Sequence, residues 1–114
     1  VNPAAGRTWS FVDCPSLSLA GTDWDSDAGA IYVDNSEMTL GGEMRFGRNV
    51  MLVVSNGASL NLTGAFGYHS SKAWPSNIEI RVEGQGSRFV GGGYRVAGED
   101  MRVRVLDGAS MESV

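Results

Sequence analysis

Three carboxylates at alternate positions are the clearest candidate for metal chemistry in this sequence. Asp23, Asp25 and Asp27 lie in a stretch that reads as a turn. Carboxylate oxygens that converge at this spacing are the ligands that Ca²⁺ prefers, so these three residues are the candidate metal ligands and Ca²⁺ is the candidate cofactor. Ala28 stands where an EF-hand loop has its sharp-turn glycine, and no helices flank the stretch. A solvated acidic turn is therefore the alternative interpretation.

A second candidate site lies in residues 65–76, where one repeat is longer than the others. This insertion holds Tyr68, Trp74 and the only histidine of the chain, His69. Enlarged loops of repeat proteins often bind, and aromatic rings with polar neighbours suit stacking on a sugar. We therefore predict Tyr68, His69 and Trp74 as ligand contacts. The alternative is that Trp74 and Phe66 fold back to cover the interior.

Catalytic chemistry is not indicated by the acidic residues. Acids or amides recur at one repeat position, as Asp13, Asp34, Asn56 and Asp107. Short polar side chains that hydrogen bond to their own turn explain this recurrence. General acid–base catalysis needs an acid and a base at a suitable separation, and no such pair is visible. We predict no catalytic residues, and a single histidine does not make a metal site.

The elements that must position these residues are short strands in a repeated order. The longest stretch without Gly or Pro, residues 30–40, alternates instead of showing a helical period. Similar segments begin at Phe11, Tyr32, Val54, Val82 and Val105, with spacings of 21, 22, 28 and 23 residues. Repeats of this length with strand signals predict an all-β, right-handed parallel β-helix of about five turns over residues 1–114. A β-sandwich, the competing fold, would not need the same residue types in every repeat.

Alternation along the strands divides their residues into inward and outward columns. The predicted inward columns are Val50/Ile78/Met101, Leu52/Ile80/Val103 and Val54/Val82/Val105, and the outward columns are Met51/Glu79/Arg102 and Val53/Arg81/Arg104. Glu79 beside Arg102 is a favourable pair, but Arg81 beside Arg104 is unfavourable unless an anion or water separates them. A third strand in each turn is predicted at 44–46, 65–67 and 94–96.

Two motifs carry a resemblance to a known family. Residues 29–32 (GAIY), followed by 46–49 (FGRN), resemble the paired motifs of polymorphic outer-membrane protein repeats. Residues 54–64 are similar to the passenger domains of autotransporters and adhesins that have a pectin-lyase-like β-helix. The resemblance implies an extracellular or cell-surface module with a structural or adhesive role that binds glycan or protein through its turn loops. The alternative is a fragment of a polysaccharide lyase or glycoside hydrolase of the same fold.

Composition excludes several other classes. The net charge of −4 argues against a nucleic-acid binder held by phosphate contacts. The longest apolar run, Val50–Val54, is far too short to span a membrane. The single cysteine, Cys14, excludes an internal disulfide and a multi-cysteine metal site.

The end of the sequence carries an expectation of its own. A solenoid needs a cap that hides the open backbone edge of its last turn. Residues 108–114 read as a turn interrupted within a repeat, without a polar cap. We therefore expect the chain to be a segment of a longer polypeptide, and this end to stack on further repeats or on another copy of the chain.

Overall fold

The computed structural model describes residues 7–19, 24–26, 28–67, 76–95 and 99–113, which form strands joined by short turns. The first sheet, sheet A, consists of β1 (Thr8–Val12), β4 (Ala30–Asp34), β7 (Arg48–Ser55), β10 (Ser76–Glu83) and β13 (Glu99–Leu106). Sheet B consists of β2 (Leu17–Leu19), β5 (Glu37–Leu40), β8 (Ser59–Leu62), β11 (Arg88–Gly91) and β14 (Ser110–Ser113). Sheet C consists of β3 (Trp24–Ser26), β6 (Met44–Phe46), β9 (Ala65–Gly67) and β12 (Gly93–Arg95). No helix capable of crossing a membrane occurs in these ranges.

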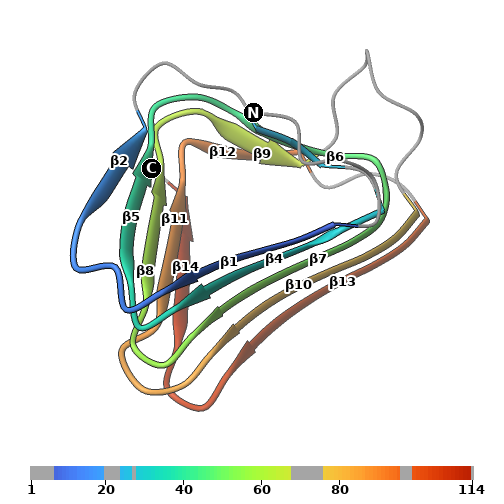
Figure 1. Cartoon of the computed structure of the whole chain (residues 1–114). Helices are drawn as coiled ribbons and strands as arrows, with labels where there is room; N and C mark the ends of the chain where they lie inside the picture. The colour runs from blue at the N-terminus through green and yellow to red at the C-terminus, as the bar shows by residue number, and fades with distance from the viewer. Residues whose placement is uncertain (1–6, 20–23, 27, 68–75, 96–98, 114) are drawn as a thin grey trace.

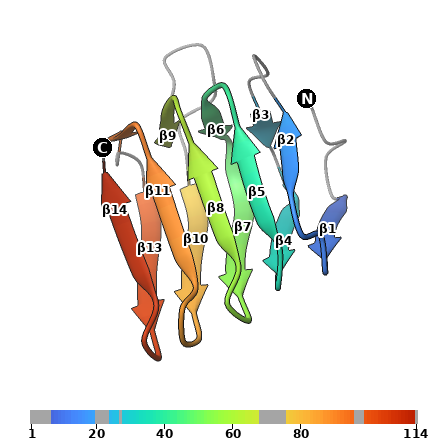
Figure 2. The same cartoon turned by 90° about the vertical axis from the view of Figure 1, so that its left-hand side faces the viewer.

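The three sheets are the sides of a parallel β-solenoid with a triangular cross-section (Figure 1). Each turn of the chain adds one strand to each sheet, and every strand pairs in parallel with the equivalent strand of the next turn. Figures 1 and 2 together show that the chain winds clockwise as it recedes from the viewer of Figure 1, which is a right-handed coil. Sheets A and B hold five strands and sheet C four, which confirms the predicted β-helix.

The register of sheet A confirms the predicted columns of its last three strands. Ile80 of β10 pairs with Leu52 of β7 on one side and with Val103 of β13 on the other. The neighbouring columns Val50/Ile78/Met101 and Val54/Val82/Val105 are also in register. Because side chains of a strand alternate between its two faces, these three columns all point into the triangle.

The register of β4 differs from the predicted alignment by one residue on both sides, because Val33, and not Tyr32, pairs with Phe11 and with Val54. The offset between Phe11 and Val33 is 22 residues. In sheet B the offset is 21 residues, because Leu17 pairs with Met38 as predicted. The turn between β1 and β2 is therefore one residue longer than the turn between β4 and β5. This shift turns the apolar Phe11 and Val33 inward and leaves Tyr32 on the outer face.

The interior is filled by apolar side chains of all three sheets, among them a cluster of three phenylalanines from sheets B and C. The Phe46 and Phe66 rings lie 5.7 Å apart, and the Phe66 and Phe89 rings 5.0 Å apart. All three side chains are buried, and Phe66 is only 1% exposed. Phe66 therefore covers the interior, as one of the two interpretations of the long repeat predicted, while Trp74 lies outside the described residues.

Burial departs from the simple inward and outward division at several positions, among them one valine of β7 and two of β13. Val53 faces outward but is 4% exposed, since its register partners on the outer face are the larger Tyr32 and Arg81. Val103 and Val105, predicted as interior residues, are 42% and 43% exposed. They lie on the outermost described strand of sheet A, so no further coil covers them.

The corner between sheets A and B is built from residues in the left-handed region of backbone conformation. Its five positions, one from each turn, are Asp13, Asn35, Asn56, Gly84 and Asp107, with φ between 45° and 95°. Glycine, asparagine and aspartate tolerate this conformation best. Asn35 donates a hydrogen bond to Asp13 (2.8 Å), and Asn56 donates one to Asp34 (2.9 Å). The second member of this column is thus Asn35, and the prediction of Asp34 was wrong by one residue.

The corner between sheets B and C requires glycine because the backbones of successive turns lie very close together. The amide of Gly64 donates to the carbonyl of Gly42, and the amide of Gly92 donates to that of Gly64. A Cβ atom added at Gly64 would lie 2.6 Å from the Gly42 oxygen. Side chains are therefore excluded at this corner.

Candidate functional site

The predicted ligand and metal residues lie largely outside the described part of the chain. Tyr68, His69 and Trp74 are not among the described residues, and neither are Asp23 and Asp27. Asp25 lies in strand β3, in register with Arg45, and not in the turn that we expected. Across the described ranges, no group of three or more His, Cys, Asp or Glu side chains could hold a metal ion.

A different cluster, which sequence reasoning identified only in part, lies on the outer face of sheet A. Its centre is Glu79 of β10, whose side chain is only 9% exposed although it points away from the core. The Glu79 carboxylate is 2.5 Å from Arg81 on the same strand. On β13, the Nε atoms of Arg102 and Arg104 lie 3.5 Å and 3.6 Å from its Oε1. One carboxylate thus meets three guanidinium groups.

The geometry resolves the like-charge pair that the sequence predicted. Arg81 and Arg104 are register partners, and Glu79 forms an ion pair with each of them. The anion needed between the arginines is therefore supplied by the chain itself. Sequence alternation gave the Glu79–Arg102 pair, but it could not show that the carboxylate also reaches the neighbouring column, because that depends on side-chain length and direction.

The surroundings of Glu79 favour its charged form. Burial of the carboxyl acts to raise its pKa, but hydrogen bonds and charge from Arg81, with Arg102 and Arg104, outweigh burial and hold the pKa below its ordinary value. Glu79 is therefore an ionised carboxylate at neutral pH. It is not poised to give up a proton as a general acid would.

A shallow cleft of about 110 Å³ adjoins this cluster. It is lined by Asn49 near the start of β7, Asn77 near the start of β10 and Arg102 of β13. Asn77 donates a hydrogen bond to Asn49 (2.9 Å) and accepts one from Arg102 (3.0 Å). Arg102 also pairs with Asp100 at 2.6 Å, and the hydrogen bond to Asp100 raises the Arg102 pKa above its ordinary value. These bonds fix the guanidinium group at the rim of the cleft.

The three arginines keep part of their surface in contact with solvent. The side chains of Arg81, Arg102 and Arg104 are 32%, 36% and 53% exposed. Each guanidinium has five N–H donors in a planar fork that matches carboxylate and sulfate groups. We call these three residues the arginine row. Its chemistry suits binding of an anion on the outer face of sheet A.

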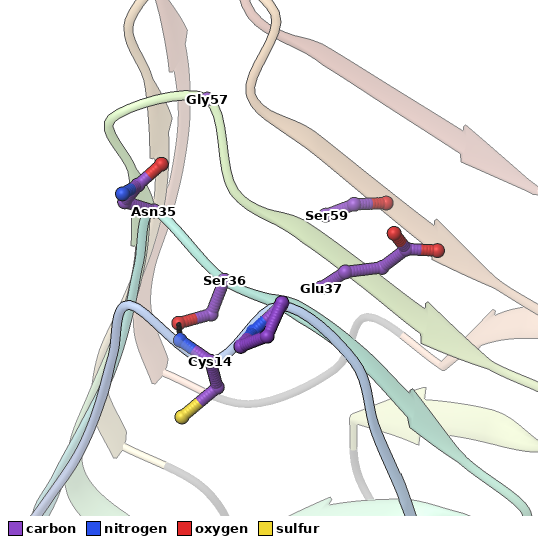
Figure 3. Close-up of a pocket in the computed structure, with 7 residues that line it drawn as sticks. Cys14, Asn35, Ser36, Glu37, Gly57 and Ser59 are labelled. Atoms are coloured by element: carbon purple, nitrogen blue, oxygen red, sulfur yellow. Dashed lines mark hydrogen bonds between the residues drawn. The ribbon is translucent and has the colours of Figure 1, made fainter.

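A second cleft, of about 210 Å³, lies at the corner between sheets A and B and includes Cys14 (Figure 3). The Ser36 hydroxyl accepts a hydrogen bond from the Cys14 amide (3.0 Å) and is 2.8 Å from the Asp34 carbonyl, to which it donates. Figure 3 shows the Cys14 thiol pointing away from the Glu37 carboxylate and Ser59. The Ser36 hydroxyl therefore hydrogen bonds to backbone groups of the corner. Neither this hydroxyl nor the Cys14 thiol is arranged with the Glu37 carboxylate as a nucleophile with its base.

In comparisons with protein-family models, with curated proteins and with solved structures, nothing matches this chain.

Proposed function

We propose that this protein is a non-catalytic, extracellular or cell-surface β-solenoid module with an adhesive role, and that it binds acidic glycan along the arginine row. The observation that carries the proposal is the convergence of three guanidinium groups on one carboxylate. With Asp100 included, the cluster holds three cations against two carboxylates. Glu83 lies two residues beyond Arg81 on the same face, so the row offers three partly exposed guanidinium groups and not a net positive charge.

The strand arrangement supports binding of a repeating anion. Arg81 and Arg104 lie on neighbouring parallel strands, which are spaced by about 4.8 Å. Arg102 lies two residues from Arg104 on the same face. An extended sugar chain with carboxylate or sulfate groups can therefore place more than one anionic group against the row. Tyr68, His69 and Trp74, which precede β10 in the sequence, are proposed as additional sugar contacts.

The chemistry of the described residues favours binding over turnover. A carboxyl that acts as a general acid near neutral pH needs a raised pKa, whereas the pKa of Glu79 is lowered. The Glu79 carboxylate oxygens are already engaged by arginine. We therefore favour an adhesive module over a polysaccharide lyase or glycoside hydrolase.

The experiment is a screen of polyuronides and sulfated polysaccharides for binding and for cleavage, with and without a calcium chelator. We expect binding that weakens as salt is added, because the contacts are ionic, and we expect no cleavage products under either condition. Chelator-sensitive cleavage would instead favour the lyase alternative.

Two variants that each remove one positive charge, at different places on the surface, make the binding test specific. Arg104→Ala removes a cation from the arginine row, while Arg88→Ala removes one from the outer face of sheet B, where Arg88 pairs with Glu112 at 2.8 Å. We expect Arg104→Ala to weaken polyuronide binding by about fivefold or more and Arg88→Ala to have little effect. Equal losses in the two variants would contradict binding at the row.

A further inference from the structure

Apolar side chains are exposed at both ends of the described solenoid. Strands β1 and β13 are the outermost described strands of sheet A, one at each end of the stack (Figure 2). Among the residues whose burial the structure describes, the exposed large hydrophobic ones all lie on these two strands: Trp9, Val12, Val103, Val105 and Leu106. An outermost strand has unpaired backbone N–H and C=O groups along its open edge, and another strand can pair with them, especially where exposed apolar side chains lie beside that edge.

One outward column shows that the two ends match each other. Val12 pairs with Asp34, Asp34 with Ser55, and Glu83 with Leu106. Ser55 and Glu83 directly follow the paired Val54 and Val82. The column is therefore polar in its three inner turns and apolar at both ends. Val12 is 53% exposed and Leu106 is 41% exposed, although polar residues would suit these outward positions.

We infer that the chain associates head to tail with a second copy of itself, with β13 of one protomer parallel to β1 of the next. Continuing the observed register by one strand would place Leu106 beside Val12 of the next copy. Two inward columns would continue in the same way, because Val103 shares its column with Trp9 and Val105 shares its column with Phe11. A second copy therefore continues these two inward columns of sheet A without a shift, while Met101 of the third inward column would lie beside Arg7 of the next copy.

In sheet A, the contact brings together no pair of opposite charges. The outward Arg102 and Arg104 would meet Thr8 and Ser10, which carry no charge. At the left-handed corner, Asp107 would lie beside Asp13 of the next copy. Two carboxylates on neighbouring strands, which are spaced by about 4.8 Å, repel each other. This pair limits the affinity, and it also provides a way to test the register.

The contact is heterologous, since it joins two different surfaces of the chain. Such a contact leaves one free end of each kind and extends into open assemblies unless the rotation closes a ring. The inference rests on the fold and the terminal strands, and it does not depend on glycan binding.

The test is an analytical ultracentrifugation series over concentration with two blocking variants. Val12→Lys and Leu106→Lys each place a charge in the contact, and each new lysine lies beside an acid of its own chain, Asp34 or Glu83. The fold is therefore kept, and circular dichroism checks it. We expect the average mass of the unmodified protein to rise with concentration and each variant alone to associate at least about tenfold more weakly.

An equal mixture of the two variants gives the decisive result. Val12→Lys retains an intact β13 end and Leu106→Lys an intact β1 end, so one native contact can form between them. We expect the mixture to produce dimers and to stop there. Dimers of Val12→Lys alone would indicate a symmetric contact between two β13 ends, and monomers in every sample, the unmodified protein included, would also overturn the inference.

Asp13→Asn tests the register of the contact independently. The asparagine would still accept the hydrogen bond from Asn35, and its amide could donate to Asp107 of the neighbouring copy, as Asn35 donates to Asp13 within the chain. We expect association about fivefold stronger than that of the unmodified protein, because a repulsion is replaced by a hydrogen bond. Unchanged or weaker association would contradict the proposed register.

Discussion

Arg81 and Arg104 are register partners on adjacent strands, and both form ion pairs with the same carboxylate, that of Glu79, at 2.5 Å and 3.6 Å. Two arginines side by side on a sheet would repel each other if nothing lay between them. Glu79 lies two residues before Arg81 and therefore on the same face of the strand. A single acid thus makes a row of three cations compatible with the fold.

This arrangement predicts a specific dependence of stability on pH. The pKa of Glu79 is lowered in the folded protein from a reference value of 4.5. Its contribution to stability is therefore complete above about pH 4.5 and is lost as the pH falls through the lower folded pKa. Compared with the unmodified protein, Glu79→Gln should be less stable at pH 7 and should lose less stability between pH 4.5 and about pH 3. Urea unfolding at a series of pH values measures both effects.

Glu112→Gln is the matched control for this prediction. A hydrogen bond from Arg88 lowers the Glu112 pKa, but both side chains of that pair are 49% exposed, so solvent screens the interaction. We expect Glu112→Gln to change the pH dependence less than Glu79→Gln does. Equal pH profiles for the two variants would show that the arginine row does not hold Glu79 in its charged form.

The phenylalanine cluster predicts a large cost for loss of its middle ring. Phe66 is 1% exposed and lies between Phe46 and Phe89. Phe66→Ala should lower the free energy of unfolding by about 3–5 kcal/mol, because it removes buried area and leaves a cavity. Phe66→Leu, which fills most of the space, should cost clearly less. A loss below about 1 kcal/mol for the alanine variant would contradict the packing described for sheet C.

The left-handed corner predicts opposite tolerance for two small residues at the same position. Asn56 has a φ of 55° and donates a hydrogen bond to Asp34. Asn56→Ala should lose about 1–3 kcal/mol from backbone strain and the missing bond. Asn56→Gly loses the bond and some backbone entropy on folding but avoids the strain, and Gly84 already occupies the equivalent place in the next turn. Thermal melts should rank glycine above alanine, and the reverse order would exclude the assigned conformation.

The glycine corner predicts that one added methyl group is destabilising at Gly64 and tolerated at Gly93. A Cβ at Gly64 would lie 2.6 Å from the Gly42 carbonyl oxygen, so the backbones of two turns would have to separate. A Cβ at Gly93 would meet its nearest atom at 3.9 Å. We expect Gly64→Ala to cost about 1–3 kcal/mol and Gly93→Ala to be nearly neutral in urea unfolding. Similar costs at both positions would argue against the close approach.

Sequence analysis could predict the solenoid because the interior of each turn repeats the same apolar pattern. Leu52, Ile80 and Val103 lie in one column because strands in the last three turns have equal spacing between their apolar residues. It could not fix the register of β4, since a constant offset assumes turns of constant length. The turn between β4 and β5 is one residue shorter than the turns between β1 and β2 and between β7 and β8, so that Val33, and not Tyr32, pairs with Phe11 and Val54.

The candidate site was less accessible to sequence reasoning than the fold. The pairing of Glu79 with Arg102 follows from alternation, but the reach of Glu79 to Arg104 depends on three long side chains in their actual rotamers. The exposure of Val103 was missed for a different reason. Alternation gives the direction of a side chain, whereas burial also needs a neighbouring coil to cover it.

The parallel winding of the chain is tested most directly by nuclear Overhauser effects between backbone protons of neighbouring turns. The account predicts cross-peaks that connect Leu52 with Ile80 and Ile80 with Val103, in the pattern of parallel strands. Strong contacts between opposed Hα protons, which mark antiparallel pairs, or no contacts between these residues, would contradict it.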